Sequence, residues 1–143
     1  MKPTGTTPLA DTKVDTKIVL SGLWTSTLFV FAYVDIFGFW RADIINGALE
    51  GEVPGPGFEI GQTFLALTTL YILIPSLMVV ISLIAPAGLN RTANLVVSAV
   101  YALTIVLSLV GETWIYFIVG SIVELVLLLA IAKIAWTWGG ATT

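Results

Sequence analysis

The sequence has no cysteine, no histidine and few charges, with six basic and nine acidic residues among 143. The absence of cysteine excludes disulfides and thiolate chemistry, and the absence of histidine removes the usual metal ligand and general base. With so few basic residues and a net charge of −3, we expect no nucleic-acid partner. We likewise expect no cofactor, no metal site and no catalytic residue. A charged fraction of 10% is too small to cover a soluble domain, so a soluble enzyme is excluded.

Apolar residues dominate what is present, at 57% of the chain with a mean hydropathy of +1.00. Four apolar runs lie at about 18–38, 60–84, 92–111 and 114–136. Each is near the roughly 20 residues that a helix needs to cross the bilayer. Because lipid cannot pair bare backbone groups, and barrel strands are much shorter, the runs are predicted to be helices. The predicted fold is all-α, a polytopic membrane protein built as an antiparallel bundle of four transmembrane helices.

The connections divide the chain into a membrane domain and its tails. Breakers at 85–88 and at Gly111 make two connections short, so spans two to four are expected to form a compact unit to which span one attaches. The loop at 39–59 is acidic, and its 42–49 segment has the spacing of a short amphipathic helical turn. We expect a disordered tail at 1–17, a membrane domain at 18–138 and a short C-terminal tail at 139–143.

The basic residues predict the orientation, because cytoplasmic segments retain lysine and arginine. Five of the six fall on one side of the predicted bundle, and Arg41 alone falls on the other. The five are Lys2, Lys13, Lys17, Arg91 and Lys133. Both termini are therefore expected to be cytoplasmic in a multi-pass protein of the cell (plasma) membrane, with the 39–59 loop outside.

Small and polar residues recur at helical spacing in each span, which predicts one inward face per helix. The predicted faces are Ser21, Thr25, Leu28, Ala32 and Asp35; Gln62, Ala66, Thr69, Leu73 and Ser76; Asn94, Ser98, Tyr101, Ile105 and Ser108; and Phe117, Gly120, Ser121, Glu124, Leu128 and Ile131. Two interpretations stay open. The stripes are either helix-packing seams or the lining of a polar central pocket.

Glu124 is the most informative residue, because it lies ten residues into span four, roughly 15 Å deep. No basic residue is expected to reach it, so we predict a mostly neutral side chain at pH 7. Counting from the outer ends of the spans places Tyr101 and Thr69 within hydrogen-bonding reach. Glu124 is then either a neutral link between helices or a carboxyl group that carries a proton or binds a ligand.

Two further positions qualify this picture. Asp35 lies three residues from the outer end of span one, on the predicted face of Thr25. It either pairs with Arg41 or lines the mouth of a pocket. Pro75 interrupts span two, where we expect a kink, with Ser76 helping to satisfy the freed carbonyl groups.

Several short motifs occur in one order along most of the chain. They are Leu23-Trp24-Thr25-Ser26, Tyr33 with Asp35 and Phe37-Gly38, Pro75-Ser76-Leu77-Met78, Leu89-Asn90-Arg91, Trp114 with Tyr116-Phe117, Val123-Glu124 and Ala135-Trp136-Thr137-Trp138. Over about residues 17–138 this pattern resembles a family of small bacterial four-helix membrane proteins classed as a domain of unknown function. The resemblance implies four spans, a bacterial origin and no established activity. It also implies that Asp35 and Glu124 belong to the family's pattern.

Three hypotheses of function follow. In the first, a transport or small-ligand-binding protein, Glu124 carries a proton or holds a cationic or hydroxylated lipophile. Asp35 then gates the outer mouth, Tyr101 and Thr69 orient Glu124, and a homodimer completes the pathway. In the second, the chain is an accessory subunit of a larger membrane complex. The third, an intramembrane enzyme acting on a quinone or lipid, is the least favoured, because no nucleophile, metal site or nucleotide motif is present.

Overall fold

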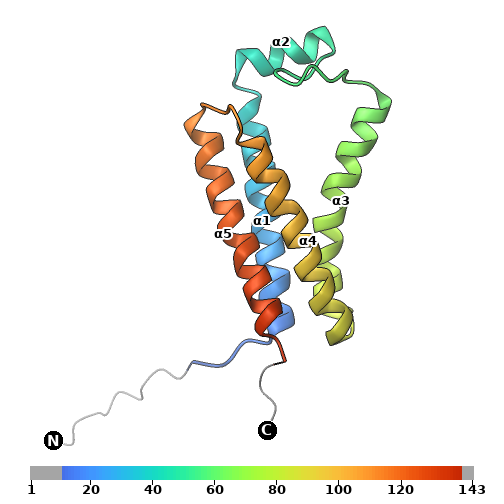
Figure 1. The fold of residues 1–143 in the computed structure, drawn as a ribbon, viewed down its shortest axis with the longest axis vertical. Coiled ribbons are helices and arrows are strands. Elements are labelled where there is room, and N and C mark those ends of the chain that lie inside the picture. Colours follow the sequence, from blue (N-terminus) through green and yellow to red (C-terminus); the bar gives the residue numbers. More distant parts are fainter. Residues whose placement is uncertain (1–10, 140–143) are drawn as a thin grey trace, which may run out of the picture.

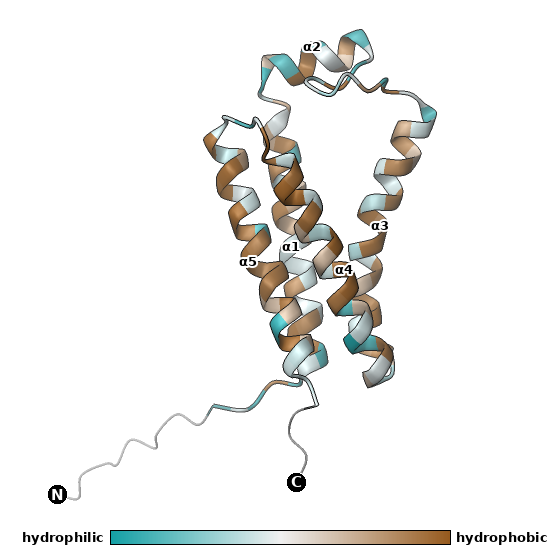
Figure 2. Ribbon diagram, viewed as in Figure 1, coloured by the Kyte–Doolittle hydropathy of each residue, from teal (hydrophilic) through white to brown (hydrophobic). Residues whose placement is uncertain are grey.

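The computed structural model describes residues 11–139, which form five helices in an all-α arrangement (Figure 1). Four are long, namely α1 (Thr16–Gly38), α3 (Gln62–Ile84), α4 (Ala87–Ser108) and α5 (Ile115–Thr137), and α2 (Ala42–Glu50) is short. Each long helix is long and apolar enough to cross a membrane. The chain is therefore a helical membrane protein, with its apolar residues concentrated on the long helices (Figure 2).

The long helices run alternately up and down, so both ends of the described chain emerge at one end of the bundle (Figure 1). We call this the terminal end, and the opposite end, which carries α2, the loop end. The segment expected to form a short helical turn is α2, which ends at Gly51 in the left-handed conformation (φ 78°). Residues 1–10 and 140–143, including Lys2 and most of both expected tails, lie outside the described residues.

Helix ends differ from the prediction where capping decides them. The first helix begins at Thr16 because the side chain of Asp15 accepts a hydrogen bond from the Lys17 backbone N–H, at 2.8 Å. The third span, predicted from about 92, corresponds to α4, which begins at Ala87, directly after Pro86. Proline before the first helical residue costs no helical hydrogen bond, so it starts this helix instead of delaying it. Arg91 consequently lies within α4 and not in a connecting loop.

The expected compact unit of spans two to four is wrong, because α1 is the helix that holds the bundle together. It packs against both α3 and α5, and α5 packs against α4, whereas α3 and α4 touch little. The two-residue connection joins α3 and α4 only at the terminal end, and the helices separate toward the loop end (Figure 1). Aromatic rings occupy the space between them, with Tyr71 and Tyr101 at 4.6 Å between ring centroids.

The predicted inward faces hold for two helices and fail for two. Asn94, Ser98, Tyr101 and Ile105 of α4 are buried, as are Ser121, Glu124, Leu128 and Ile131 of α5. In α1 only Ser21 of the predicted face is buried, and the buried face otherwise runs through Leu20, Trp24, Thr27 and Phe31. The only buried residues of α3 are Pro75, Met78 and Ser82, none of which belongs to the predicted stripe.

A buried polar network joins α1, α3 and α4 near the terminal end. The indole N–H of Trp24 donates to Oδ1 of Asn94 at 2.7 Å, and Nδ2 of Asn94 donates to Oδ1 of Asn90 at 2.7 Å. Nδ2 of Asn90 in turn donates to the backbone carbonyl of Ser82 at 2.6 Å. All four residues are fully buried. The network therefore fixes the closed end of the bundle, from which α3 diverges toward the loop end.

Candidate functional site

All four long helices contribute to the lining of a cavity of about 270 Å³, which we call the inner chamber. It is lined by Phe31, Val34 and Asp35 of α1, Thr68, Tyr71 and Ile72 of α3, Thr104, Ile105 and Ser108 of α4, and Phe117 and Glu124 of α5. Two of the predicted site residues, Asp35 and Glu124, thus border one space. The chamber lies within the lengths of the apolar helices.

Neither acidic group of the chamber has a cationic partner in the part of the chain that the structure describes. Glu124 is 4% exposed and takes part in none of the side-chain hydrogen bonds or ion pairs of residues 11–139. No fully buried side-chain oxygen or nitrogen in this range lacks a hydrogen-bond partner, so the carboxyl oxygens of Glu124 reach accessible space. The expected pair between Asp35 and Arg41 does not form, because Arg41 binds Asp43 and Glu112 instead.

The other predicted site residues lie outside the chamber lining. The hydroxyl group of Tyr101 donates to the backbone carbonyl of Tyr71, four residues before Pro75. This is the carbonyl that Pro75, having no N–H, leaves without its helical partner. Tyr101 therefore does what we expected of Ser76, whose hydroxyl donates to Ile72 O at 2.8 Å.

The two predicted threonines are also directed elsewhere. Thr69 is exposed and donates to its own helix at Leu65 O, at 2.8 Å, and Thr25 donates to Ser21 O at 2.9 Å. The hydroxyl groups that do line the chamber are those of Thr68, Tyr71, Thr104 and Ser108. The hydroxyl oxygens of Tyr71 and Thr104 lie 2.7 Å apart, joining α3 to α4.

A second cavity, of about 430 Å³, lies beside the chamber toward the loop end, and we call it the vestibule. It shares Val34, Asp35, Ser108 and Phe117 with the chamber. Its remaining lining includes Arg41, Asp43, Ile44, Glu112, Thr113 and Tyr116, with Pro54, Gly55 and Pro56 of the loop after α2. Asp35 thus borders both the vestibule and the chamber.

Arg41 organises the charges of the vestibule. Its guanidinium group donates to both carboxylate oxygens of Asp43, at 3.1 and 2.6 Å, and to Glu112 at 3.2 Å, and lies 4.7 Å from the ring centroid of Trp114. These hydrogen bonds lower the pKa of Asp43. Burial opposes ionisation of Glu112, but backbone N–H groups of Trp114 and Thr113, together with Arg41, hold its pKa below the usual value. The pKa of Arg41 is raised, chiefly by its hydrogen bonds to Asp43.

Replacing Arg41 with glutamine is expected to cost about 1 kcal/mol of stability at pH 7, since it breaks the pair with Glu112 and the contact with Trp114. Because the carboxyl pKa values are lowered in the folded state, the ion pairs stabilise it above the usual carboxyl pKa. This contribution is lost as the pH falls through the lowered pKa values. The free energy of unfolding of wild type and Arg41→Gln, measured at pH 7 and at pH 3, tests this expectation. The exposed Lys133→Gln is the control, and an equal cost for Arg41→Gln at both pH values would contradict the assignment.

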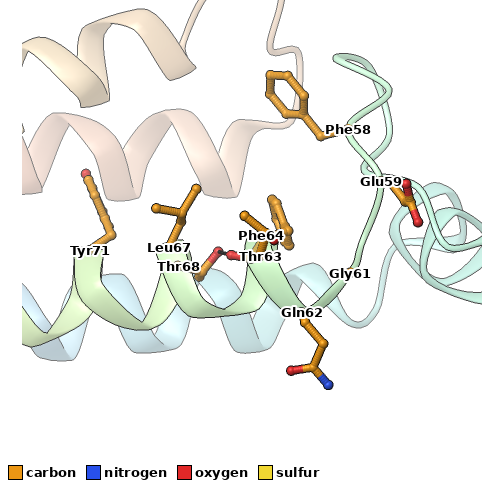
Figure 3. Close-up of a pocket in the computed structure, with 9 residues that line it drawn as sticks. All are labelled: Phe58, Glu59, Gly61, Gln62, Thr63, Phe64, Leu67, Thr68 and Tyr71. Atoms are coloured by element: carbon orange, nitrogen blue, oxygen red, sulfur yellow. Dashed lines mark hydrogen bonds between the residues drawn. The ribbon is translucent and has the colours of Figure 1, made fainter.

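An apolar groove of about 760 Å³ runs along the loop-end half of α3 (Figure 3). Its lining residues are Phe58, Glu59, Gly61, Gln62, Thr63, Phe64, Leu67, Thr68 and Tyr71. Figure 3 shows Phe64, Leu67 and Tyr71 on one side of α3, with Phe58 nearby and Gln62 directed away. The groove shares Thr68 and Tyr71 with the inner chamber. The chamber therefore adjoins the polar vestibule at Asp35 and the apolar groove at Tyr71.

Comparison with known proteins agrees with the family resemblance seen in the sequence. Within residues 11–139, no group of three acidic side chains is placed to hold a metal ion. Neither the curated proteins nor the solved structures gave a match to the chain. A family described as a family of unknown function (DUF6326) matches residues 10–143, which include both acids of the chamber. The chain therefore belongs to this family of unknown function, DUF6326.

Proposed function

We propose that this membrane protein binds a small cationic ligand in the inner chamber, in exchange for a proton on Glu124. The observation that carries the proposal is the pair of acidic side chains, Asp35 and Glu124, on one cavity within the apolar helices. Neither has a cationic partner among the described residues. Acidic groups inside membrane spans mark ion and substrate sites unusually often.

The chemistry of the chamber supports an exchange. A carboxylate in low-dielectric surroundings is costly unless a proton or a cation neutralises it. Proton and ligand then compete for Glu124, so binding one releases the other. Asp35 lines the same chamber and offers the bound cation a second acidic partner. The hydroxyl groups of Tyr71 and Thr104 are bonded to each other, and Thr104 also donates to Tyr101 O at 2.8 Å, so their oxygens are left to accept a hydrogen bond from a hydroxylated ligand.

We place the protein in the plasma membrane with the terminal end in the cytoplasm. Of the basic residues in the described range, Lys13, Lys17, Arg91 and Lys133 lie toward the terminal end, and Arg41 lies at the loop end. The positive-inside rule then directs the vestibule outward. The natural sequence has no cysteine, so single cysteines can be introduced in the 39–59 loop and near Lys133. Labelling each one in intact cells with a thiol reagent that does not cross membranes shows which side it lies on.

An accessory or dimeric role has one observation in its favour. Helix α3 buries only Pro75, Met78 and Ser82, so most of its apolar side chains face outward. A second copy or a larger membrane partner can pack against this flank. Purification in mild detergent tests the alternative, because recovery of a stoichiometric larger partner would favour the accessory role, whereas a homodimer would fit the transport hypothesis.

Glu124→Gln is expected to weaken binding of tetramethylammonium at least about tenfold, because the amide has no charge to pair with the cation. Calorimetric titration of the protein in lipid nanodiscs measures the affinity, and a pH indicator measures the proton released. Wild-type affinity is expected to rise with pH, since a protonated carboxyl group does not pair with a cation. That rise should be missing in Glu124→Gln.

The control variant is Glu50→Gln, which neutralises an exposed acid on α2 away from the chamber. It makes the same Glu→Gln substitution outside the chamber and should bind like wild type. Equal binding by Glu124→Gln and Glu50→Gln would overturn the proposal.

A further inference from the structure

The apolar groove and the inner chamber offer two different chemistries on either side of Tyr71. The chamber side carries Asp35 and Glu124, and the groove side carries the apolar surfaces of Phe58, Phe64 and Leu67. Phe58 and Leu67 are each 61% exposed, so the groove is open to its surroundings. Because it lies along the first turns of a membrane-spanning helix, those surroundings are the lipids of the loop-end leaflet.

Tyr71 and Thr68 form the boundary between the two spaces, as both line each of them. The Tyr71 hydroxyl is joined to Thr104 of α4 at 2.7 Å, and its ring lies against that of Tyr101. Beyond this point toward the loop end, α3 stands apart from α4 (Figure 1). Because the groove and the chamber share Thr68 and Tyr71, a ligand that passes Tyr71 moves from one to the other without crossing the charged vestibule.

We propose that the ligand of the chamber is a cationic amphiphile that arrives from the membrane, with its charged head at Glu124 and Asp35 and its apolar tail in the groove. The inference rests on the proposed function and adds the ligand class and the route. Charge complementarity assigns the head, since the acids have no cationic partner among residues 11–139. Continuity past Thr68 and Tyr71 assigns the tail.

The vestibule is unsuited to an apolar tail. It is lined by the guanidinium group of Arg41 and the carboxylates of Asp43 and Glu112, which an alkyl chain would desolvate at a cost. These same groups are compatible with water and protons. The groove therefore admits the ligand from the lipid, and the vestibule admits water and the exchanged proton.

Two quaternary ammonium ions test the inference, because both carry a permanent charge. Dodecyltrimethylammonium has a tail for the groove, and tetramethylammonium has none. Leu67→Trp fills the groove, whereas the matched Leu70→Trp places the same bulk on the same helix at a similarly exposed site, 56% against 61%, that lines neither cavity. A second pair is Phe58→Ala in the groove and Phe39→Ala outside it, at 61% and 67% exposure.

Binding is measured in nanodiscs, with empty nanodiscs to subtract partition of the long ion into lipid. We expect Leu67→Trp and Phe58→Ala to weaken binding of the dodecyl ion about tenfold and to leave tetramethylammonium unchanged. Their control variants should bind both ions like wild type. If the groove variants match their controls while Glu124→Gln still loses both ions, the inference is wrong and the proposed function stands. If Glu124→Gln binds both ions like wild type, both fail.

Discussion

Replacing Asn94 with leucine is expected to lower the free energy of unfolding by about 2 kcal/mol. Leucine has nearly the same volume, so the effect comes from hydrogen bonding. The substitution leaves the Trp24 indole N–H and the Asn90 side-chain oxygen without their partners in a fully buried site. A single interhelical hydrogen bond in a membrane is worth only about 0.6 kcal/mol on average. The larger expected value reflects several bonds lost together at one residue.

Circular dichroism during titration with sodium dodecyl sulfate in mixed micelles measures this loss of stability. Asn46→Leu is the matched control, because Asn46 is exposed on the short helix α2, and it should change stability little. Trp24→Phe removes the indole donor of the same bond. In combination with Asn94→Leu it is expected to cost less than the sum of the two single variants, since both partners are then apolar. If the losses of stability in the two single variants simply add in the double variant, the hydrogen bond between Trp24 and Asn94 is not what stabilises the terminal end.

Helix formation here followed from composition, but which side of each helix faces inward did not. The rule that small and polar residues face the bundle worked for α4 and α5, whose buried faces carry Asn94, Ser98, Ser121 and Glu124. It failed for α1, where the buried face carries the rings of Trp24 and Phe31. Large aromatic side chains fill a wide space between helices, and nothing in the spacing of one helix reveals how far away its neighbours lie.

In the candidate site, too, the sequence predicted some of the residues and not others. Charge alone drew attention to Asp35 and Glu124, because an acid within an apolar run is costly wherever it faces. The hydroxyl groups of the chamber could not be chosen in this way, since a threonine can satisfy itself on its own helix, as Thr69 does at Leu65 O. Thr68, one residue away, donates in the same way to Phe64 O at 3.0 Å and yet lines the chamber. Successive residues are rotated by about 100° around a helix, so one side chain can face the cavity while the next faces the lipid.

Glycine at position 120 is expected to set the distance between α1 and α5. A Cβ atom built on Gly120 would collide with a methyl group of Val34. Valine is stiff in a helix, so this methyl group cannot rotate away cheaply. Overpacking costs up to about 3 kcal/mol and the better helix propensity of alanine returns up to about 1, so Gly120→Ala should lose about 2 kcal/mol.

Gly22→Ala is the control, because a Cβ atom on Gly22 of α1 would meet no other atom within 4 Å, and this variant should be as stable as wild type or slightly more so. The decisive variant is Gly120→Ala with Val34→Ala, which makes room for the added methyl group and should recover most of the lost stability.

Val34 precedes Asp35 and Gly120 lies one turn before Glu124, so the same close approach brings the two acids to one chamber. Gly120→Ala should therefore also weaken tetramethylammonium binding, and the double variant should restore it. Lost stability without weaker binding would mean that the chamber tolerates a wider spacing of α1 and α5.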